Sequence, residues 1–160
     1  MTDRRSGLRG LVLRVASALK WLPPTVARLT LGWVFIESGW GKLHNLEKVI
    51  GFFGSLGIPA PQIQAPMAAF FEFACGVLLL VGLATRVASL PIIVIMIVAL
   101  VTAKKGDIHE ISDLFGLGEY LYICLALWLG AYGAGPISAD AVIARRMDAG
   151  ETAVPARARA

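Results

Sequence analysis

The chain has 160 residues, of which 57% are hydrophobic, and its mean hydropathy is +0.71. Only about half of the residues of a soluble domain are apolar, so this composition argues against a soluble domain and indicates an integral membrane protein. The net charge is +4, but the basic residues stand in short segments beside apolar runs. That arrangement points to the lipid bilayer rather than nucleic acid as a partner.

The N-terminal residues 1–22 are expected to be cytoplasmic and to contain an amphipathic helix at the membrane surface. Helical spacing places six aliphatic side chains on one face, with basic residues elsewhere on the wheel. Two alternatives are a plain lead-in to the first span and a cleaved signal peptide. Ala16-Ser17-Ala18 resembles a cleavage site, but Arg14 interrupts the apolar region before it. The six aliphatic residues are Leu8, Leu11, Val12, Val15, Leu19 and Leu22.

Four apolar runs follow, at residues 25–40, 66–83, 87–103 and 116–134. Each comes close to the roughly 20 helical residues that cross a bilayer core of about 30 Å. The fold predicted for residues 23–140 is therefore an all-α integral membrane domain, an antiparallel bundle of four transmembrane helices. A short interfacial helix is expected around Val49 to Phe53, and residues 82–86 leave only a tight turn between spans two and three. The tail, 141–160, is predicted to be cytoplasmic and disordered.

The distribution of basic residues predicts the orientation. They are concentrated on the side that carries both termini, which places the N and C termini in the cytoplasm of a bacterial inner membrane. That side carries Arg4, Arg5, Arg9, Arg14, Lys20, Arg86, Arg145, Arg146, Arg157 and Arg159, against Lys42, Lys48, Lys104 and Lys105 on the other.

Three carboxyl groups, Glu37, Glu72 and Glu119, fall at similar predicted depth in the outer half of the bilayer, and Lys42 lies near them. Ionisable groups are costly in lipid and often functional there. We interpret them as a polar chamber for proton transfer or for a quinone head group, with His44, His109 and Glu110 as further partners at its mouth. The alternative is that each carboxyl group pairs with a neighbouring helix and only fixes the bundle, Glu37 or Glu119 with Lys42 and Glu72 with a backbone or hydroxyl donor.

At the inner boundary, Arg28, Arg86 and Asp140 are expected to meet in a structural clasp that joins three segments. The two cysteines, Cys75 and Cys124, form no CxxC motif. They fit inert packing in apolar surroundings, with a redox pair as the alternative. Since both histidines lie in loops, no metal site is predicted.

Three segments resemble the DoxX family of small four-helix bacterial membrane proteins: RLTLGWVFIESGWGKL, EFACGVLLLVGLATRVAS and GLGEYLYICLALWLGAYGAGPISAD. The resemblance covers about residues 28–140. It implies that the stretch between Phe35 and Gly39 is usually uncharged in the family, so Glu37 is a departure from the family pattern. The resemblance also implies a redox-associated membrane function, since relatives include the membrane subunit of a thiosulfate:quinone oxidoreductase and a protein said to link a superoxide dismutase with a sulfurtransferase. The matching positions are Arg28, Gly32, Phe35, Gly39, Lys42, Glu72, Gly76, Gly82, Arg86, Glu119, Gly133, Gly135, Ser138 and Asp140.

The leading hypothesis is an accessory or quinone-interacting subunit of a membrane redox system for sulfur oxidation or oxidative-stress defence. Its expected partners are the lipid bilayer, quinone and other redox proteins, and it could form oligomers. In this hypothesis Glu37, Glu72 and Glu119 handle protons and Lys42 orients a polar head group. The alternatives are a non-catalytic scaffold or assembly factor and a carrier of protons or small solutes.

Overall fold

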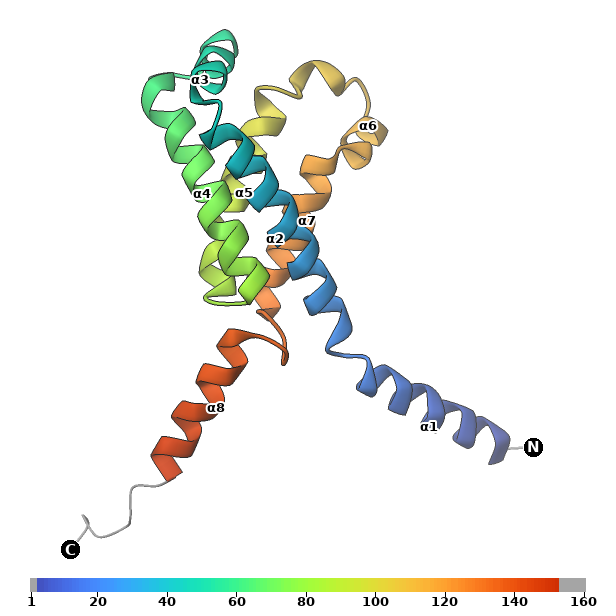
Figure 1. Ribbon diagram of the computed structural model, residues 1–160. Helices are drawn as coiled ribbons and strands as arrows, with labels where there is room; N and C mark the ends of the chain where they lie inside the picture. The colour runs from blue at the N-terminus through green and yellow to red at the C-terminus, as the bar shows by residue number, and fades with distance from the viewer. Residues whose placement is uncertain (1–2, 153–160) are drawn as a thin grey trace, which may run out of the picture.

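The computed structural model describes residues 3–152, with side chains for residues 10–147 (Figure 1). Over this range all regular structure is helical, which confirms the all-α prediction. The helices are α1 (Asp3–Ala18), α2 (Leu22–Leu43), α3 (Leu46–Ser55), α4 (Pro61–Val81), α5 (Thr85–Val101), α6 (Ile111–Gly116), α7 (Gly118–Tyr132) and α8 (Ala139–Thr152), with a 3-10 turn at Lys105–Asp107.

Helices α2, α4, α5 and α7 pack side by side into a bundle (Figure 1). Helix α2 packs along α4, α5 packs along α7, and the tight turn after Val81 makes α4 and α5 antiparallel neighbours, as predicted. Helices α3 and α6 lie at one end of the bundle, which we call the α3 end. Helices α1 and α8 project from the opposite end, the α8 end.

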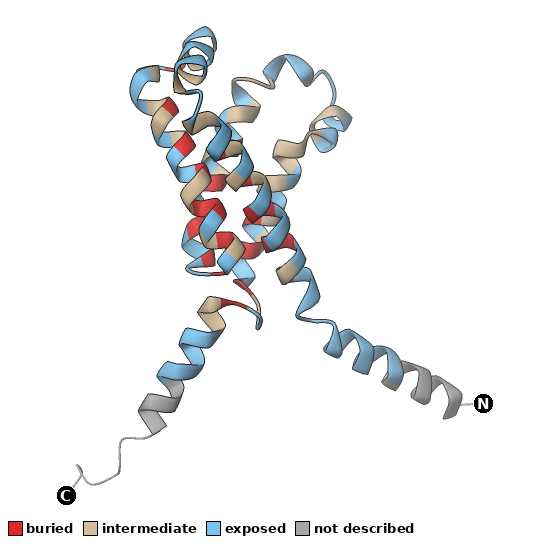
Figure 2. Ribbon diagram, in the orientation of Figure 1, coloured by how far each residue is buried: buried red, intermediate tan, exposed pale blue. Residues whose placement is uncertain are grey.

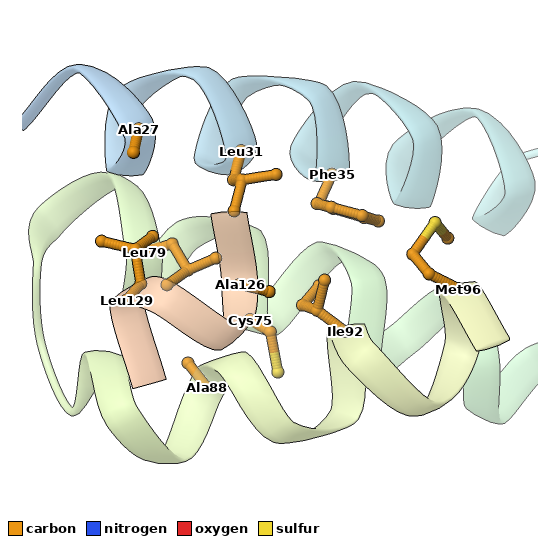
Figure 3. Packing of buried hydrophobic residues seen from close by; sticks show 10 residues of the cluster. All are labelled: Ala27, Leu31, Phe35, Cys75, Leu79, Ala88, Ile92, Met96, Ala126 and Leu129. Atoms are coloured by element: carbon orange, nitrogen blue, oxygen red, sulfur yellow. The ribbon is translucent and has the colours of Figure 1, made fainter. Parts of the chain in front are cut away.

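The bundle has a small apolar core and an apolar surface. Leu31, Phe35, Leu79, Ile92 and Leu129 are fully or almost fully buried between the helices (Figure 3). The outer faces of the same helices are exposed and still carry large apolar side chains (Figure 2). Exposed apolar surface on all sides of a bundle is what a lipid environment accepts and water does not. By length and hydropathy, α4 meets the usual criteria for a membrane span, and α5 is apolar but shorter.

Three glycines bring the backbones of α2 and α4 into contact. A Cβ atom added to Gly32 would lie 2.7 Å from the Leu80 nitrogen, and one added to Gly76 would lie 2.7 Å from the Ile36 nitrogen. A Cβ on Gly39 would overlap the backbone of Phe73 in the same way. Small residues at such a crossing are typical of helices that associate in lipid. They fix how α2 is aligned against α4.

Two helix boundaries differ from the sequence prediction. Helix α4 begins at Pro61, because proline is tolerated in a first helical turn, whereas the predicted run began at residue 66. The tail predicted to begin at residue 141 starts with helix α8, which continues to Thr152. The Ser138 hydroxyl accepts a hydrogen bond from the Ala141 N–H (3.1 Å), a typical N-cap that starts this helix. Residues 153–160 lie outside the described part of the chain.

Candidate functional site

A buried carboxylate joins the two glycine-packed helices. Glu72, on α4, has no solvent-exposed surface. One oxygen, Oε1, pairs with the Lys42 ammonium, and the other, Oε2, accepts a hydrogen bond from the Ser38 hydroxyl at 2.9 Å. Both partners come from α2. Burial of a carboxylate is tolerated only when it is paired and hydrogen-bonded, and Glu72 meets both conditions.

The spacing of residues on α2 explains this pairing. Ser38 and Lys42 are four residues apart, so they lie on the same face one turn from each other. Gly39 lets that face approach α4 closely, which brings Ser38 level with Glu72. The long Lys42 side chain reaches the same carboxylate from the next turn. Ser38 was missed in the sequence, although its i,i+4 relation to Lys42 is a signal that could have identified it.

The Lys42–Glu72 pair lies in the wall of a cavity of about 440 Å³ at the α3 end. Helices α3, α4 and α5 contribute most of the lining. Most of it is apolar, and the polar groups besides this pair are Lys48, Gln64 and Thr102. The principal apolar lining residues are Phe52, Phe53, Met67, Val94, Met96 and Val98. Such a cavity, apolar with a few polar groups, is typical of small-molecule sites.

The ammonium of Lys42 remains available to a ligand. Its side chain is 32% exposed, whereas that of Glu72 is 0% exposed. An ammonium carries three N–H donors, and the structure shows one of them on Glu72. The remaining donors could bind a carbonyl or phenolate oxygen in the cavity.

The structure does not bring the three predicted carboxyl groups together. Glu37 lies on the exposed side of α2, and Glu119 is half-buried in the first turn of α7. Within the described side chains, neither forms an ion pair or hydrogen bond with Glu72. Glu37 is nearly level with Glu72 across the α2–α4 contact, but the two are separated by the rotation of α2, since Glu37 is exposed and Glu72 is buried. A carboxylate at the α7 N-terminus is favourable with the helix dipole.

The predicted partners at the mouth of the chamber make local contacts instead. His44 Nδ1 lies 2.9 Å from the Trp40 carbonyl oxygen of its own helix. The backbone N–H groups of His109 and Glu110 both donate to the Asp113 carboxylate at 2.9 Å, closing the start of α6. These two hydrogen bonds lower the pKa of Asp113.

The predicted inner clasp forms with different partners. Asp140 makes no direct ion pair with a described arginine. Its carboxylate accepts hydrogen bonds from the N–H groups of Ala84 (2.7 Å) and Thr85 (3.1 Å) at the start of α5. These N–H groups have no partner within the helix, and the helix dipole favours an anion there. The physical reason for the correction is therefore that Asp140 satisfies the free N–H groups at the start of α5 instead of pairing with an arginine.

Arg28 and Arg86 occupy separate places at the α8 end. Arg28 is only 4% exposed, donates from Nη2 to the Ile137 carbonyl oxygen (2.8 Å) and packs against Gly82. Gly82 has a positive φ of 75° and ends α4. Arg28 is thus a cation at the negative end of α4. Arg86 is exposed and lies over Gly133.

The described residues form neither a cysteine pair nor a group of side chains that could bind a metal ion. Cys75 is buried, Cys124 is exposed, and both are free thiols. Between residues 10 and 147, no group of three His, Cys, Asp or Glu side chains is placed to hold a metal ion.

The apolar surface and the helical bundle define a membrane protein, and comparison with known proteins gives its family. The chain belongs to the DoxX family, whose profile matches residues 24–105. It is 31% identical over 140 residues to the uncharacterized membrane protein Rv3486 of Mycobacterium tuberculosis, covering 79% of this chain and 86% of that protein. It is 36% identical over 98 residues to the Bacillus subtilis protein named "Putative oxidoreductase CatD", covering 61% of this chain and 68% of that protein. No solved structure matches the chain.

Proposed function

We propose that α2, α4, α5 and α7 all cross the bacterial inner membrane, with both termini in the cytoplasm. Supporting observations are the apolar outer faces of these helices and the basic residues at the α8 end, which include Arg86, Arg145 and Arg146. In this arrangement the α3 end faces away from the cytoplasm. The cavity then opens in the outer half of the membrane.

We further propose that this cavity binds the head group of a quinone. The observation that carries the proposal is an apolar cavity of about 440 Å³ whose wall contains the hydrogen-bonded pair of the buried Glu72 and the partly exposed Lys42. A quinone has a flat apolar ring, a long apolar tail and two carbonyl oxygens. The ring would pack on Phe52, Phe53 and Met67, and Lys42 would donate a hydrogen bond to one carbonyl oxygen.

The proposed activity is support of electron transfer to or from the quinone pool. Reduction of a quinone to a quinol takes up two electrons and two protons. In this proposal the Lys42 ammonium gives one proton to the quinone oxygen that it binds and is reprotonated from water, while Glu72 stabilises the ammonium. The second quinone oxygen takes its proton from water, and a partner redox protein supplies the two electrons. The name of the related CatD protein agrees with a redox role but does not extend it to this chain.

Binding of decyl-ubiquinone or a menaquinone analogue to purified protein in lipid nanodiscs tests this function. We expect Glu72→Gln and Lys42→Met each to weaken binding at least tenfold, because they remove the pair that orients the head group. Glu119→Gln, which changes a carboxyl group outside the cavity, is expected to bind like the unchanged protein. Equal binding by all three variants would exclude this site, provided that circular dichroism shows the helices intact.

A further inference from the structure

Helix α2 presents one continuous exposed face that no other described helix covers. It runs through Thr30, Trp33, Glu37, Trp40 and His44, spaced by three or four residues, so all five lie on one side of the helix. Trp33 is 65% exposed and Trp40 is 54% exposed. Glu37 stands in the middle of this face, which we call the Glu37 face. No described side chain donates a hydrogen bond to it.

The contacts between α2 and α4 give the depth of Glu37. Helix α4 has 21 residues, a length of about 31 Å that matches the thickness of a bilayer core. Its middle residue is Phe71. On α2, Gly39 abuts Phe73 and Ile36 abuts Gly76, so Glu37 is level with residues 73–76. That position is only about 3–8 Å along the axis from the middle of α4.

A carboxyl group at this position has an unfavourable environment in a single chain. If α2 crosses the membrane as proposed above, the Glu37 face meets lipid tails near the bilayer centre. An acidic residue there costs about 3 kcal/mol on insertion scales, and such residues almost always turn inward or find a partner. Glu72 on α4 shows the inward solution, since it faces α2 and accepts a hydrogen bond from Ser38. Glu37 must find its partner outside the chain.

We propose that the Glu37 face is the contact surface for a second copy of this chain. A two-fold axis along the membrane normal would place Glu37 opposite Glu37 of the partner. Two carboxyl groups that share a proton satisfy each other, because the protonated group donates and the ionised group accepts. A carboxyl group is thus self-complementary in a way that an ammonium is not, and two-fold pairs are the commonest oligomers.

Open space on the Glu37 face would let α2 of a second copy pack closely against it. Gly41 lies one turn from Glu37, is exposed, and has no atom within 4 Å of the position its Cβ would take. Close contact of helices at small residues is the usual mode of association in lipid. The Trp33 and Trp40 rings would flank the central carboxyl pair and exclude lipid from it.

Disulfide cross-linking of the full chain in liposomes tests this surface, and it needs no quinone, so its outcome is separate from that of the binding experiment. Gly41→Cys is introduced with Cys124→Ala, leaving the buried Cys75 in place. The matched control is Val101→Cys, an exposed position at the same end of the bundle on α5. After oxidation with copper phenanthroline, we expect covalent dimers from Gly41→Cys and at least fivefold fewer from Val101→Cys.

Substitution of Glu37 itself then tests the role of the carboxyl group. Added to Gly41→Cys, Glu37→Leu is expected to lower the dimer yield at least fivefold at low protein-to-lipid ratio. Glu37→Gln should retain most of the yield, because a carboxamide also both donates and accepts. The proposal is overturned if Gly41→Cys gives no dimer, if Val101→Cys gives an equal yield, or if Glu37→Leu has no effect. Because Glu37 is exposed in the single chain, neither substitution disturbs the core.

Discussion

The Glu72 carboxylate is completely buried, and the Lys42 ammonium that neutralises it remains partly exposed in the wall of a cavity. Because of this difference in exposure, Glu72 has a structural role and Lys42 has a proposed binding role. Glu72 joins α2 to α4, since its other oxygen is held by Ser38. Lys42 keeps donors for a ligand. The same two residues therefore connect the stability of the bundle with its proposed binding function.

Removal of one member of this pair should destabilise the protein more than removal of both. Lys42→Met leaves a buried carboxyl group without its cation, and breaking a buried pair in this way costs about 3–5 kcal/mol. In the double variant Lys42→Met/Glu72→Gln, the amide can still bind Ser38 and no uncompensated charge remains. We expect it to recover at least half of the loss. Unfolding in mixed detergent micelles measures the free energies, and additive losses would contradict this account.

Two glycines on the same helix should respond oppositely to alanine. Gly39→Ala forces a Cβ into the Phe73 backbone, so α2 and α4 must separate, and we expect a loss of about 3 kcal/mol or more. Gly41 has open space around it, so Gly41→Ala should be neutral or stabilise by up to about 1 kcal/mol from helix propensity. Thermal unfolding of the two variants measures the difference. Similar melting temperatures would argue against close contact of α2 and α4.

The turn between α4 and α5 should depend on Asp140. Asp140→Ala removes both acceptors from the start of α5, and Ala84 already adopts a positive φ of 49°. Hydrogen bonds to a charged group contribute about 1.5–3 kcal/mol, so we expect a loss of that order. Asp140→Asn keeps one acceptor oxygen and should lose less. Hydrogen exchange at the Ala84 and Thr85 amides reports this locally, and unchanged protection in Asp140→Ala would exclude the cap.

The start of α6 should loosen in acid. The folded pKa of Asp113 is lowered by the His109 and Glu110 N–H groups. A lowered folded pKa means that the stabilisation is fully present above the unfolded value near 3.9 and is lost as the pH falls through the folded value. NMR titration of the His109 and Glu110 amides should show a midpoint below 3.9, which Asp113→Asn abolishes. A midpoint at or above 3.9 would mean that these hydrogen bonds do not favour the carboxylate.

Hydropathy was sufficient to predict four long helices and the turn between α4 and α5. The start of α4 was missed because Pro66 was interpreted as the boundary, whereas Pro61 occupies the first turn and Pro66 lies inside the helix. That five-residue difference places Glu72 further from the start of its helix than expected, although Glu37 is still nearly level with it across the α2–α4 contact. Apolar runs give the approximate ends of a span, but the level of a side chain depends on where its helix starts.

The pairing of charges could not be predicted because it depends on rotation of one helix against another. The sequence offered Glu37 or Glu119 as partners of Lys42, whereas the close contact at Gly39 brings Lys42 to Glu72. Asp140 accepts its hydrogen bonds from free backbone N–H groups at the start of α5. The positions of the charged residues in the sequence do not show where such N–H groups lie. The cavity arises because α3 lies beside α4, a tertiary arrangement that the local pattern of α3 does not contain.

The most direct test of the quinone site is photolabelling with an azido-quinone in nanodiscs, followed by mass spectrometry of the labelled peptides. The cavity predicts labels on α3, α4 and α5 at Phe52, Phe53, Met67 or Val94, suppressed by excess decyl-ubiquinone and reduced in Glu72→Gln. Labels confined to the outer face of α2 or α7, or labels that excess quinone does not suppress, would contradict a quinone site at Lys42 and Glu72.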